Sequence, residues 1–325
     1  MLKNANCRYA IVVVILLFIL PGCKDEADYR VILHPEGEFL DLPAKPQQEL
    51  LDYAKDVLRK RLITAGFAAE DFIIAEKDGA IEIQIDKLEE DTATGWLEPL
   101  LTIPGNFRIV ETYHHADVIG SILTADAYLA HLQGDTAGQG PLLSRIKMAS
   151  YQLAEGEEIS PTPVIGFAFP SDTASIFRSL KIDSVKAILP AALEIIPGVT
   201  ISDSLIPLIA VRSHYRNEGL PALTKNFVQD LSIGTTEGGV VVINLQFNEN
   251  GGEYFYELTM NNFRSFIGIV LDETVIHYAM IQGGIPEGKI SIISPYGFNQ
   301  TRAIAAAMRI SSLPFPMAFE RNMRE

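Results

Sequence analysis

The sequence predicts a mixed α+β fold for this chain of 325 residues, a length that suits about two domains. One observation is a helical pattern over Gln47–Ala65, where apolar residues recur every three or four positions until Gly66 ends the helix. Another is a strand over Ile81–Ile85, where apolar and polar side chains alternate after the turn at Asp78 and Gly79. Helix and strand patterns thus lie close together in one short stretch.

Three more segments extend this pattern. A helix is predicted over Asp91–Leu101, a strand over Phe107–Tyr113, and a short strand over Tyr29–Leu33 within a polar lead. Together they form fragments of a βαββαβ series, which is typical of a small α+β sandwich.

The C-terminal third also alternates strands and helices. Val240–Phe247 predicts a strand because Val241, Ile243, Leu245 and Phe247 share one face. The other elements expected here are a helix over Gly252–Ser265, strands over Phe266–Leu271 and Lys289–Ile293, and a helix capped by Asn299 with an apolar stripe from Ala303 to Met308.

The middle segment, residues 116–219, is less regular. A helix is expected over Ser171–Leu180, with Ser171 or Asp172 as its N-cap. The remaining expectations are a loop over Gly134–Pro141 and two segments that fit either a strand or a short helix, Val185–Leu189 and Leu205–Val211.

Composition excludes several classes of protein. Lysine and arginine number 26 against 41 aspartates and glutamates, a net charge of −15, whereas nucleic-acid binding needs excess cations. Two cysteines are too few for a disulfide framework or for a metal site made of several cysteines. We therefore expect no nucleic-acid partner and no cofactor, and 48% apolar residues are enough for a packed core.

The first residues have the pattern of a cleaved secretory signal, which we assign to residues 1–22. Lys3 and Arg8 flank a polar start, and Ala10–Leu20 is an unbroken apolar run. As a helix this run would reach only about 17 Å, short of the roughly 30 Å hydrocarbon core of a bilayer. A buried cysteine beside a membrane helix is the alternative interpretation.

The end of this signal, Leu20-Pro21-Gly22-Cys23, resembles a bacterial lipobox, although its proline is unusual there. We expect Cys23 to become an acylated N-terminus, as in a palmitate-bearing lipoprotein, followed by a tether over residues 23–46. Two or more acyl chains hold a protein stably on a membrane. Lys24-Asp25-Glu26 resembles a surface-export signal, so surface exposure is the alternative to the favoured periplasmic face of the cell envelope.

Several C-terminal segments, in their order and spacing, resemble the first periplasmic domain of the SecD family. They combine a strand ending in a Val-Leu-Asp turn, a Gly-Gly turn, and a capped helix with a Leu-Pro-x-Pro exit. These are Phe266–Val275, Gly283-Gly284 and Ser291–Pro316, supported by Leu223-Thr224, Val240–Phe247 and Tyr254–Thr259. Towards the N-terminus, Val57–Phe67, Phe107–Tyr113 and Ile165–Thr173 resemble the same domain or its SecDF fusions from Bacteroidota-like bacteria.

This resemblance spans roughly residues 50–317 and implies a ferredoxin-like base with an inserted head lobe. The base lobe would occupy residues 47–115, the inserted middle segment 116–219, and a SecD-like lobe 220–325. The resemblance also implies a role in late protein export, with exported or unfolded polypeptide, or translocon subunits, as partners.

Two departures from SecD matter for function. Tyr29–Leu42 lacks the family's Gly-Leu-Asp-Leu-Gln-Gly-Gly-like motif, and the chain stops at Glu325, shortly after Pro316, where a membrane helix of SecD would begin. Proton-coupled pulling needs ionisable groups inside the membrane. We therefore expect passive, non-enzymatic capture of an emerging chain by a lipid-anchored domain. The alternative is a scaffolding or surface lipoprotein that reuses the fold.

Candidate chemistry is sparse. His114 and His115, with Glu111 and Asp117, form a local cluster, but adjacent strand residues face opposite ways and a polar strand end explains them. His277 is similarly expected at a surface, so we predict no catalytic, cofactor-binding or metal-binding residue.

For binding, the candidate surface is the apolar stretch Ala187–Ile209, which several prolines interrupt. The alternative is that this stretch only fills the core of the middle lobe.

Overall fold

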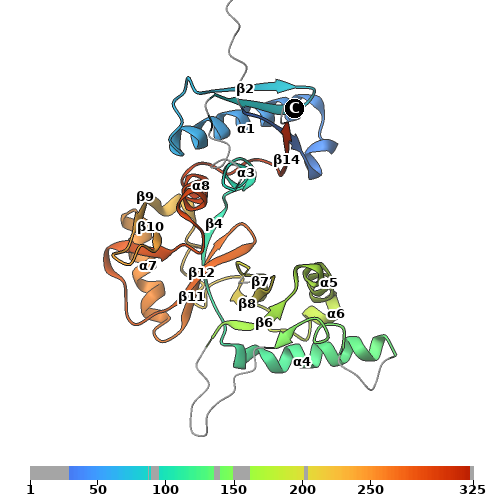
Figure 1. Ribbon diagram of the computed structural model, residues 1–325. Coiled ribbons are helices and arrows are strands. Elements are labelled where there is room, and N and C mark those ends of the chain that lie inside the picture. The colour runs from blue at the N-terminus through green and yellow to red at the C-terminus, as the bar shows by residue number, and fades with distance from the viewer. Residues whose placement is uncertain are drawn as a thin grey trace, which may run out of the picture.

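The structure is a computed structural model that describes residues 29–86, 88, 95–134, 140–148, 162–200 and 204–322. It has two parts, a base built from both ends of the chain and a head built from the residues between them (Figure 1). Helices and antiparallel sheets occur in both parts, so the predicted α+β class is confirmed. Within these ranges, no helix is long and apolar enough to cross a membrane.

The base has ferredoxin-like topology, as expected. Its strands lie in the order β14-β1-β3-β2, and each neighbouring pair is antiparallel. Two helices share a core with this sheet, to which Leu58 and Leu100 contribute fully buried side chains. The elements are β1 (Tyr29–Pro35), α1 (Ala44–Thr64), β2 (Phe72–Lys77), β3 (Ala80–Ile85), α3 (Leu97–Thr102) and β14 (Met317–Asn322), with a 3-10 turn η1 at Gly37–Asp41.

The two outer ends of the chain meet in this sheet, which the expected boundaries did not include. β1 lies in the segment expected to be a tether, residues 23–46, and it pairs with β14 from Arg30–Asn322 to Pro35–Met317. β14 lies in the segment expected to belong to a separate C-terminal lobe, residues 220–325. The strand at Tyr29 was therefore located correctly by its pattern, but its partners are set by packing between distant segments.

The head contains three sheets, ordered β12-β11-β4, β13-β10-β9 and β5-β6-β8-β7. Its strands are β4 (Phe107–Glu111), β5 (Lys147–Met148), β6 (Val164–Ala168), β7 (Leu193–Pro197), β8 (Ile206–Arg212), β9 (Val228–Thr235), β10 (Val241–Phe247), β11 (Phe266–Leu271), β12 (Thr274–Met280) and β13 (Lys289–Ile293). Its helices are α4 (His115–Leu132), α5 (Pro170–Leu180), α6 (Asp183–Lys186) and α7 (Glu249–Asn261), with 3-10 turns η2 at Lys225–Phe227 and η3 at Pro286–Gly288.

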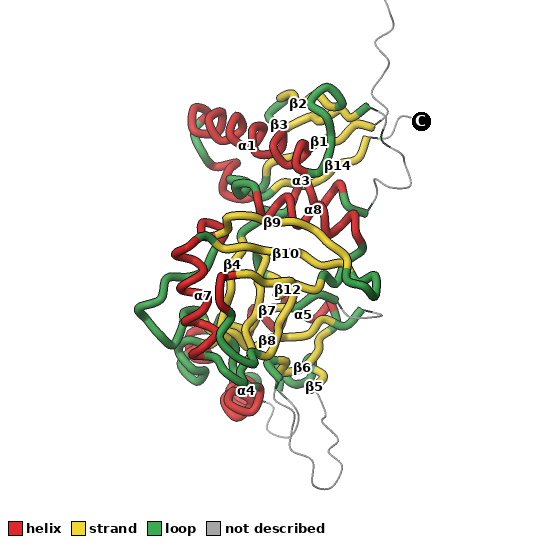
Figure 2. Tube along the Cα trace, turned by 90° about the vertical axis from the view of Figure 1, so that its left-hand side faces the viewer, coloured by secondary structure: helices red, strands yellow, loops and turns green. Residues whose placement is uncertain are grey.

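One helix joins the cores of base and head. α8 (Phe298–Arg309) packs Ala303 and Ala306 into the base core, and Ile304 and Met308 into the head core. Figure 2 shows α8 between the base and β9. Residues Ala303–Met308 are therefore buried around the whole helix, whereas its two ends, at Phe298 and Arg309, are exposed.

The two chain crossings between base and head are tied together by polar contacts. The Asp272 carboxylate accepts hydrogen bonds from the backbone N–H groups of Gly105 at 2.9 Å and Asn106 at 2.8 Å. The Lys225 ammonium donates to Ser312 on the returning segment and, at 3.4 Å, to the Gly105 carbonyl on the outgoing one. We call this group the junction cluster; burial lowers the pKa of Lys225 and raises that of Asp272.

Local structure departs from expectation in the middle segment. The helix α4 was not predicted, and it begins at His115 where a strand end was expected. Val185–Leu189 is not a strand, because α6 and the turn after it occupy this segment, whereas β8 confirms the strand alternative for Leu205–Val211. Within the loop predicted over Gly134–Pro141, residues 135–139 lie outside the described residues.

The predicted helix caps are wrong at two helices. α5 begins at Pro170, so its N-cap is Phe169 and not Ser171 or Asp172. Proline at the first helical position has no N–H to satisfy, which makes a polar cap less necessary. α8 begins at Phe298 with Gly297 as its N-cap, so Asn299 lies within the helix.

Candidate functional site

The apolar stretch proposed for binding, Ala187–Ile209, divides between core and surface. Leu208 and Ile209 on β8 and Ile196 on β7 are buried, as the alternative interpretation expected. Leu193 and Ile195 are only partly buried. The stretch therefore fills a core and also reaches the surface along β7; its residues 201–203 lie outside the described part of the chain.

A groove of about 500 Å³ runs alongside β7, and we call it the β7 groove. Its walls come from α5, from α6 and the turn after it, from β7 itself, and from the hairpin between β11 and β12. The half-buried apolar side chains that line it are Phe177, Leu180, Leu189, Leu193 and Ile195. A concave surface with such a lining is suited to holding apolar side chains of a ligand.

β7 is an edge strand of its sheet, with β8 as its single neighbour there. The Ser213 N–H donates to the Ala192 carbonyl at 2.9 Å, and the Gly198 N–H donates to the Pro207 carbonyl at 2.7 Å. This register turns the backbone groups of alternate residues towards β8, so those of Ile195 point to the outer edge. A bridge between Gly198 and Val275 closes this edge at its C-terminal end.

The charges around the groove are partly neutralised. Glu194 accepts from the Arg108 guanidinium on β4 at 3.0 and 3.2 Å, and Lys186 lies 3.4 Å from Asp183. Lys181 also lines the groove, at the end of α5. The groove thus offers apolar walls, charged side chains of both signs, and at Ile195 a strand edge that has no partner among the described residues.

The hairpin links the groove to the junction cluster. Glu273 lines the groove, and its neighbour Asp272 binds the backbone of Gly105 and Asn106. Asp272 has a positive φ of 55°, a conformation that aspartate tolerates better than most residues. One turn therefore contributes both to the base–head connection and to the groove wall.

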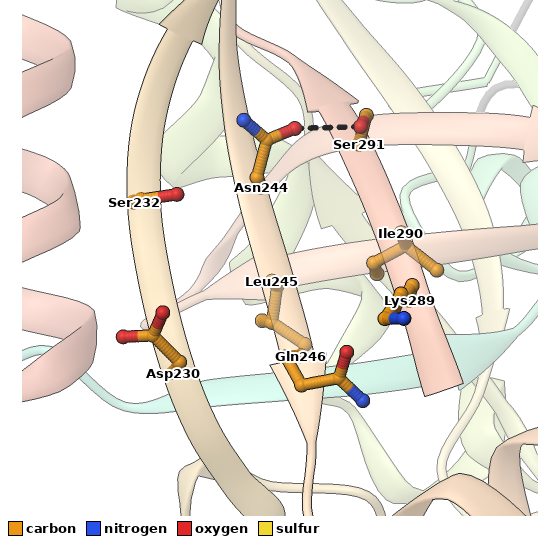
Figure 3. A pocket seen from close by; sticks show the side chains of 8 residues that line it. All are labelled: Asp230, Ser232, Asn244, Leu245, Gln246, Lys289, Ile290 and Ser291. Atoms are coloured by element: carbon orange, nitrogen blue, oxygen red, sulfur yellow. Dashed lines mark hydrogen bonds between the residues drawn. The ribbon is translucent and has the colours of Figure 1, made fainter. Parts of the chain in front are cut away.

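A second, polar hollow of about 280 Å³ lies on the outer face of the β13-β10-β9 sheet (Figure 3). Ser291 donates to the Asn244 side chain at 2.6 Å, the contact drawn there. The hollow's charged groups already have partners, since Asp230 lies 3.8 Å from Arg309 and Lys289 lies 2.8 Å from Glu287. Its side chains form a hydrogen-bonding surface and contain no nucleophile–base pair.

The histidine cluster is dispersed by the fold. His114 is the N-cap of α4, and its ring meets Phe266 edge-on at 6.4 Å. Glu111 is buried and accepts from the Asn262 side chain at 2.8 Å. His277 lies on β12, where burial lowers its pKa.

Among the described residues, no group of three or more His, Cys, Asp or Glu side chains is placed to hold a metal ion. Cys23, the expected lipid-attachment residue, lies outside the described residues.

The fold and groove define an α+β domain with a ferredoxin-like base and an inserted head that carries an open strand edge. Comparison with known sequences shows what part of this chain is similar to. Residues 210–315 match the family described as the P1 head subdomain of SecDF. This match begins in β8 and extends past α8, so most of the segment expected to form the head, residues 116–219, lies outside it.

The curated relatives are SecD proteins. The protein translocase subunit SecD of Rhodothermus marinus is 26% identical over 200 residues, which are 60% of this chain and 30% of that protein. The corresponding subunit of Acidaminococcus fermentans is 28% identical over 130 residues, 39% of this chain and 31% of that protein. The matched region thus spans about a third of each relative's length.

Solved structures of SecDF are similar at low sequence identity. One, of a membrane component that enhances protein export, has 18% identity and a TM-score of 0.47, and the match covers 91% of this chain and 99% of that chain. Another, SecDF in a super-membrane-facing form, has 17% identity and a TM-score of 0.46, covering 90% of this chain and 30% of that chain.

Proposed function

We propose that this chain is an accessory of protein export that holds extended segments of exported polypeptides in the β7 groove. The observation that carries the proposal is the outer edge of β7, where the N–H and C=O of Ile195 point outward beside half-buried apolar side chains. An extended chain can add to such an edge as a further strand, with main-chain hydrogen bonds for affinity and pockets for alternate side chains. The similarity to SecD supports export as the context.

Binding would be passive and brief. The usable edge is short, because Gly198 and Val275 bridge at one end and the Leu193 N–H donates to the Pro190 carbonyl at the other. Few main-chain bonds, each contributing about 0.5–1.5 kcal/mol net, would give weak affinity that suits transient capture. A chain so held can be released without an energy source.

A binding assay with proline substitution tests this mode. Ile195→Pro removes the outward N–H, whereas Ile195→Val keeps it and serves as the matched control. We expect Ile195→Pro to weaken the anisotropy signal of a permanently unfolded, fluorescent polypeptide about tenfold, with Ile195→Val unchanged. Circular dichroism would establish that both variants are folded, and equal binding by the two would contradict strand addition.

Crosslinking in cells tests the biological context and the rival function. A photoreactive residue replaces Lys181, which lies at the mouth of the groove. Secreted proteins or translocon subunits among the products would support the export role. A single envelope partner without secretory clients would instead favour the scaffolding lipoprotein that reuses this fold.

The lipid anchor is a separate part of the proposal. We infer from the lipobox-like sequence that Cys23 is acylated and that the domain lies on the periplasmic face of the envelope. Labelling with an alkyne fatty acid, followed by membrane fractionation, should mark the wild-type protein and not Cys23→Ser. Labelling that persists in Cys23→Ser would contradict this site.

A further inference from the structure

The outer face of α7 carries an exposed apolar stripe. On the helix, Tyr256 and Met260 are 46% and 51% exposed, at the i and i+4 spacing that places side chains on one face. Phe263, in the turn just after α7, is 54% exposed and extends the stripe. The opposite face is buried, with Phe255 and Leu258 in the head core. The stripe is therefore not needed to fix α7 to its sheet.

The stripe continues beyond the end of the helix. The Arg264 N–H donates to the Ile281 carbonyl at 2.8 Å, which holds the segment after α7 against the end of β12. Met280, on β12, is 38% exposed. Large apolar side chains gathered in this way usually mark an interaction site, and methionines adapt to varied apolar partners.

The Gly-Gly turn after β12 is shaped to this stripe. A Cβ on Gly284 would lie 2.6 Å from both the Met260 Sδ and the Tyr256 Cε2. A side chain at this position would therefore have to displace Met260 or Tyr256, whereas a Cβ on Gly283 would meet no atom within 4 Å. The loop thus packs against Tyr256 and Met260, which still leave about half of their surface exposed.

Negative charge borders the helical part of the stripe, whereas at its far end the Arg264 guanidinium lies 5.2 Å from the centre of the Phe263 ring. α7 contains Glu249, Glu253 and Glu257 and no lysine or arginine. A pocket of about 500 Å³ opens where α7 begins, lined by Glu249, Glu253, Glu287 and Tyr256 among others. Lys289 neutralises Glu287 at 2.8 Å, whereas Glu249 and Glu253 have no ion pair among the described residues.

A helix N-terminus accounts for Glu249, because an acidic residue there favours the helix dipole. It does not account for Glu253, which lies a turn further along and lines the same pocket as the Tyr256 ring. A carboxylate beside an aromatic ring suits a lysine or arginine side chain. An acidic pocket next to an apolar stripe is therefore complementary to a basic group next to an apolar run.

We propose that the outer face of α7 binds a polypeptide segment in which lysine or arginine residues adjoin a short apolar run. The cationic end lies in the pocket at Glu253 and Tyr256, and the apolar run lies along Met260 and Phe263. A second copy of this chain would bring its own α7 glutamates to the same place, where like charges repel. This face shares no residue with the β7 groove, and Figure 1 shows α7 and α5 on different sides of the head.

Fluorescence anisotropy with the purified full chain tests this inference. The probe is a labelled peptide of about 16 residues, about 24 Å as a helix, with clustered lysines followed by leucines and alanines. We expect Met260→Ser and Glu253→Gln each to weaken binding about threefold, and the double variant about tenfold. Added salt should weaken binding to the wild type more than to Glu253→Gln.

Matched controls separate the face from general surface effects. Leu123→Ser removes a side chain that is 47% exposed on α4, and Glu70→Gln removes an exposed carboxylate in the base. Both should bind the probe like the wild type. Ile195→Pro should also bind it like the wild type, because that substitution affects only the proposed strand addition in the β7 groove. Three results would overturn the inference: absence of saturable binding, unchanged affinity in the double variant, or self-association through this face in sedimentation.

Discussion

Replacing Gly105 by alanine should strongly destabilise the connection between base and head. Gly105 has φ of 87°, and a Cβ there would lie 2.5 Å from the Ala307 carbonyl oxygen of α8 and 3.1 Å from its carbon. These two atoms belong to the backbone, so no side-chain rotation relieves the contact, and the buried Arg61 Nη2 lies 3.0 Å from the same Cβ. The clash falls on the helix that joins the two cores.

The expected cost has two parts. A left-handed conformation costs an L-residue about 1–2 kcal/mol, and overpacking costs typically about 1–3 kcal/mol. Gly105→Ala should therefore lower the free energy of unfolding by about 2–5 kcal/mol. Gly79→Ala is the matched control, because Gly79 has φ of 76° with no atom within 4 Å of the added Cβ. It should cost only the conformational part, about 1–2 kcal/mol.

Urea unfolding followed by circular dichroism measures both variants against the wild type. The difference between the two variants separates the contacts with Ala307 and Arg61 from the cost of the backbone conformation. If Gly105→Ala costs no more than Gly79→Ala, the close approach of α8 to the crossing is not rigid and the reasoning fails.

Three further substitutions test the junction and α7. Burial raises the pKa of Asp272, so its contribution to stability is complete below the ordinary pKa near 4 and is lost as pH rises through the raised value. The wild type should therefore lose stability relative to Asp272→Asn as the pH rises from about 4, and parallel urea-derived curves would contradict this. Arg61 is fully buried and donates to three carbonyl groups, that of Leu100 within α3 and those of Ile103 and Pro104 just after it. Arg61→Lys should therefore cost at least about 2 kcal/mol in the same assay, with Arg59→Lys, on the surface of α1, as the control. Asn248 caps α7 by accepting from the Gly251 N–H at 2.9 Å, so thermal unfolding should show Asn248→Ala less stable by about 1 kcal/mol and Asn248→Asp unchanged.

Elements with a regular local pattern could be predicted from sequence. The helix expected at Gln47–Ala65 is α1, and the strands expected at Ile81–Ile85 and Phe266–Leu271 are β3 and β11. In α1 and β3 the spacing of apolar residues matches the buried face, whereas the unbroken apolar run of β11 is buried on both faces. The local pattern decides such segments because it reflects how many of their sides pack against a core.

α4 was missed for a physical reason. Its buried face includes Asp126, whose carboxylate accepts the N–H groups of Gly140, Leu142 and Leu143 at 2.8–3.1 Å. A buried acid interrupts the apolar pattern, and its partners lie 14 or more positions away. The sequence pattern therefore does not show that a distant loop supplies the hydrogen-bond donors that allow Asp126 to be buried.

The candidate surfaces were predicted only in part. The stretch Ala187–Ile209 is identified from sequence as an apolar run that prolines interrupt. Its strand edge, however, depends on the pairing between β7 and β8, which the sequence does not show. On α7, Tyr256 and Met260 repeat at helical spacing just as Phe255 and Leu258–Thr259 do. Spacing alone does not tell which of two apolar faces will be covered, because that depends on where the sheet lies.

The position of β14 imposes an order on folding. His34 on β1 and Glu320 on β14 pair across 286 positions of sequence, so the base sheet is completed last when the chain emerges from its N-terminus. Until then the edge of β1 that β14 covers is open. Closing so long a loop is slow, and the head can assemble before it. The domain is therefore most exposed to proteases and misassembly during the interval before its final strand arrives.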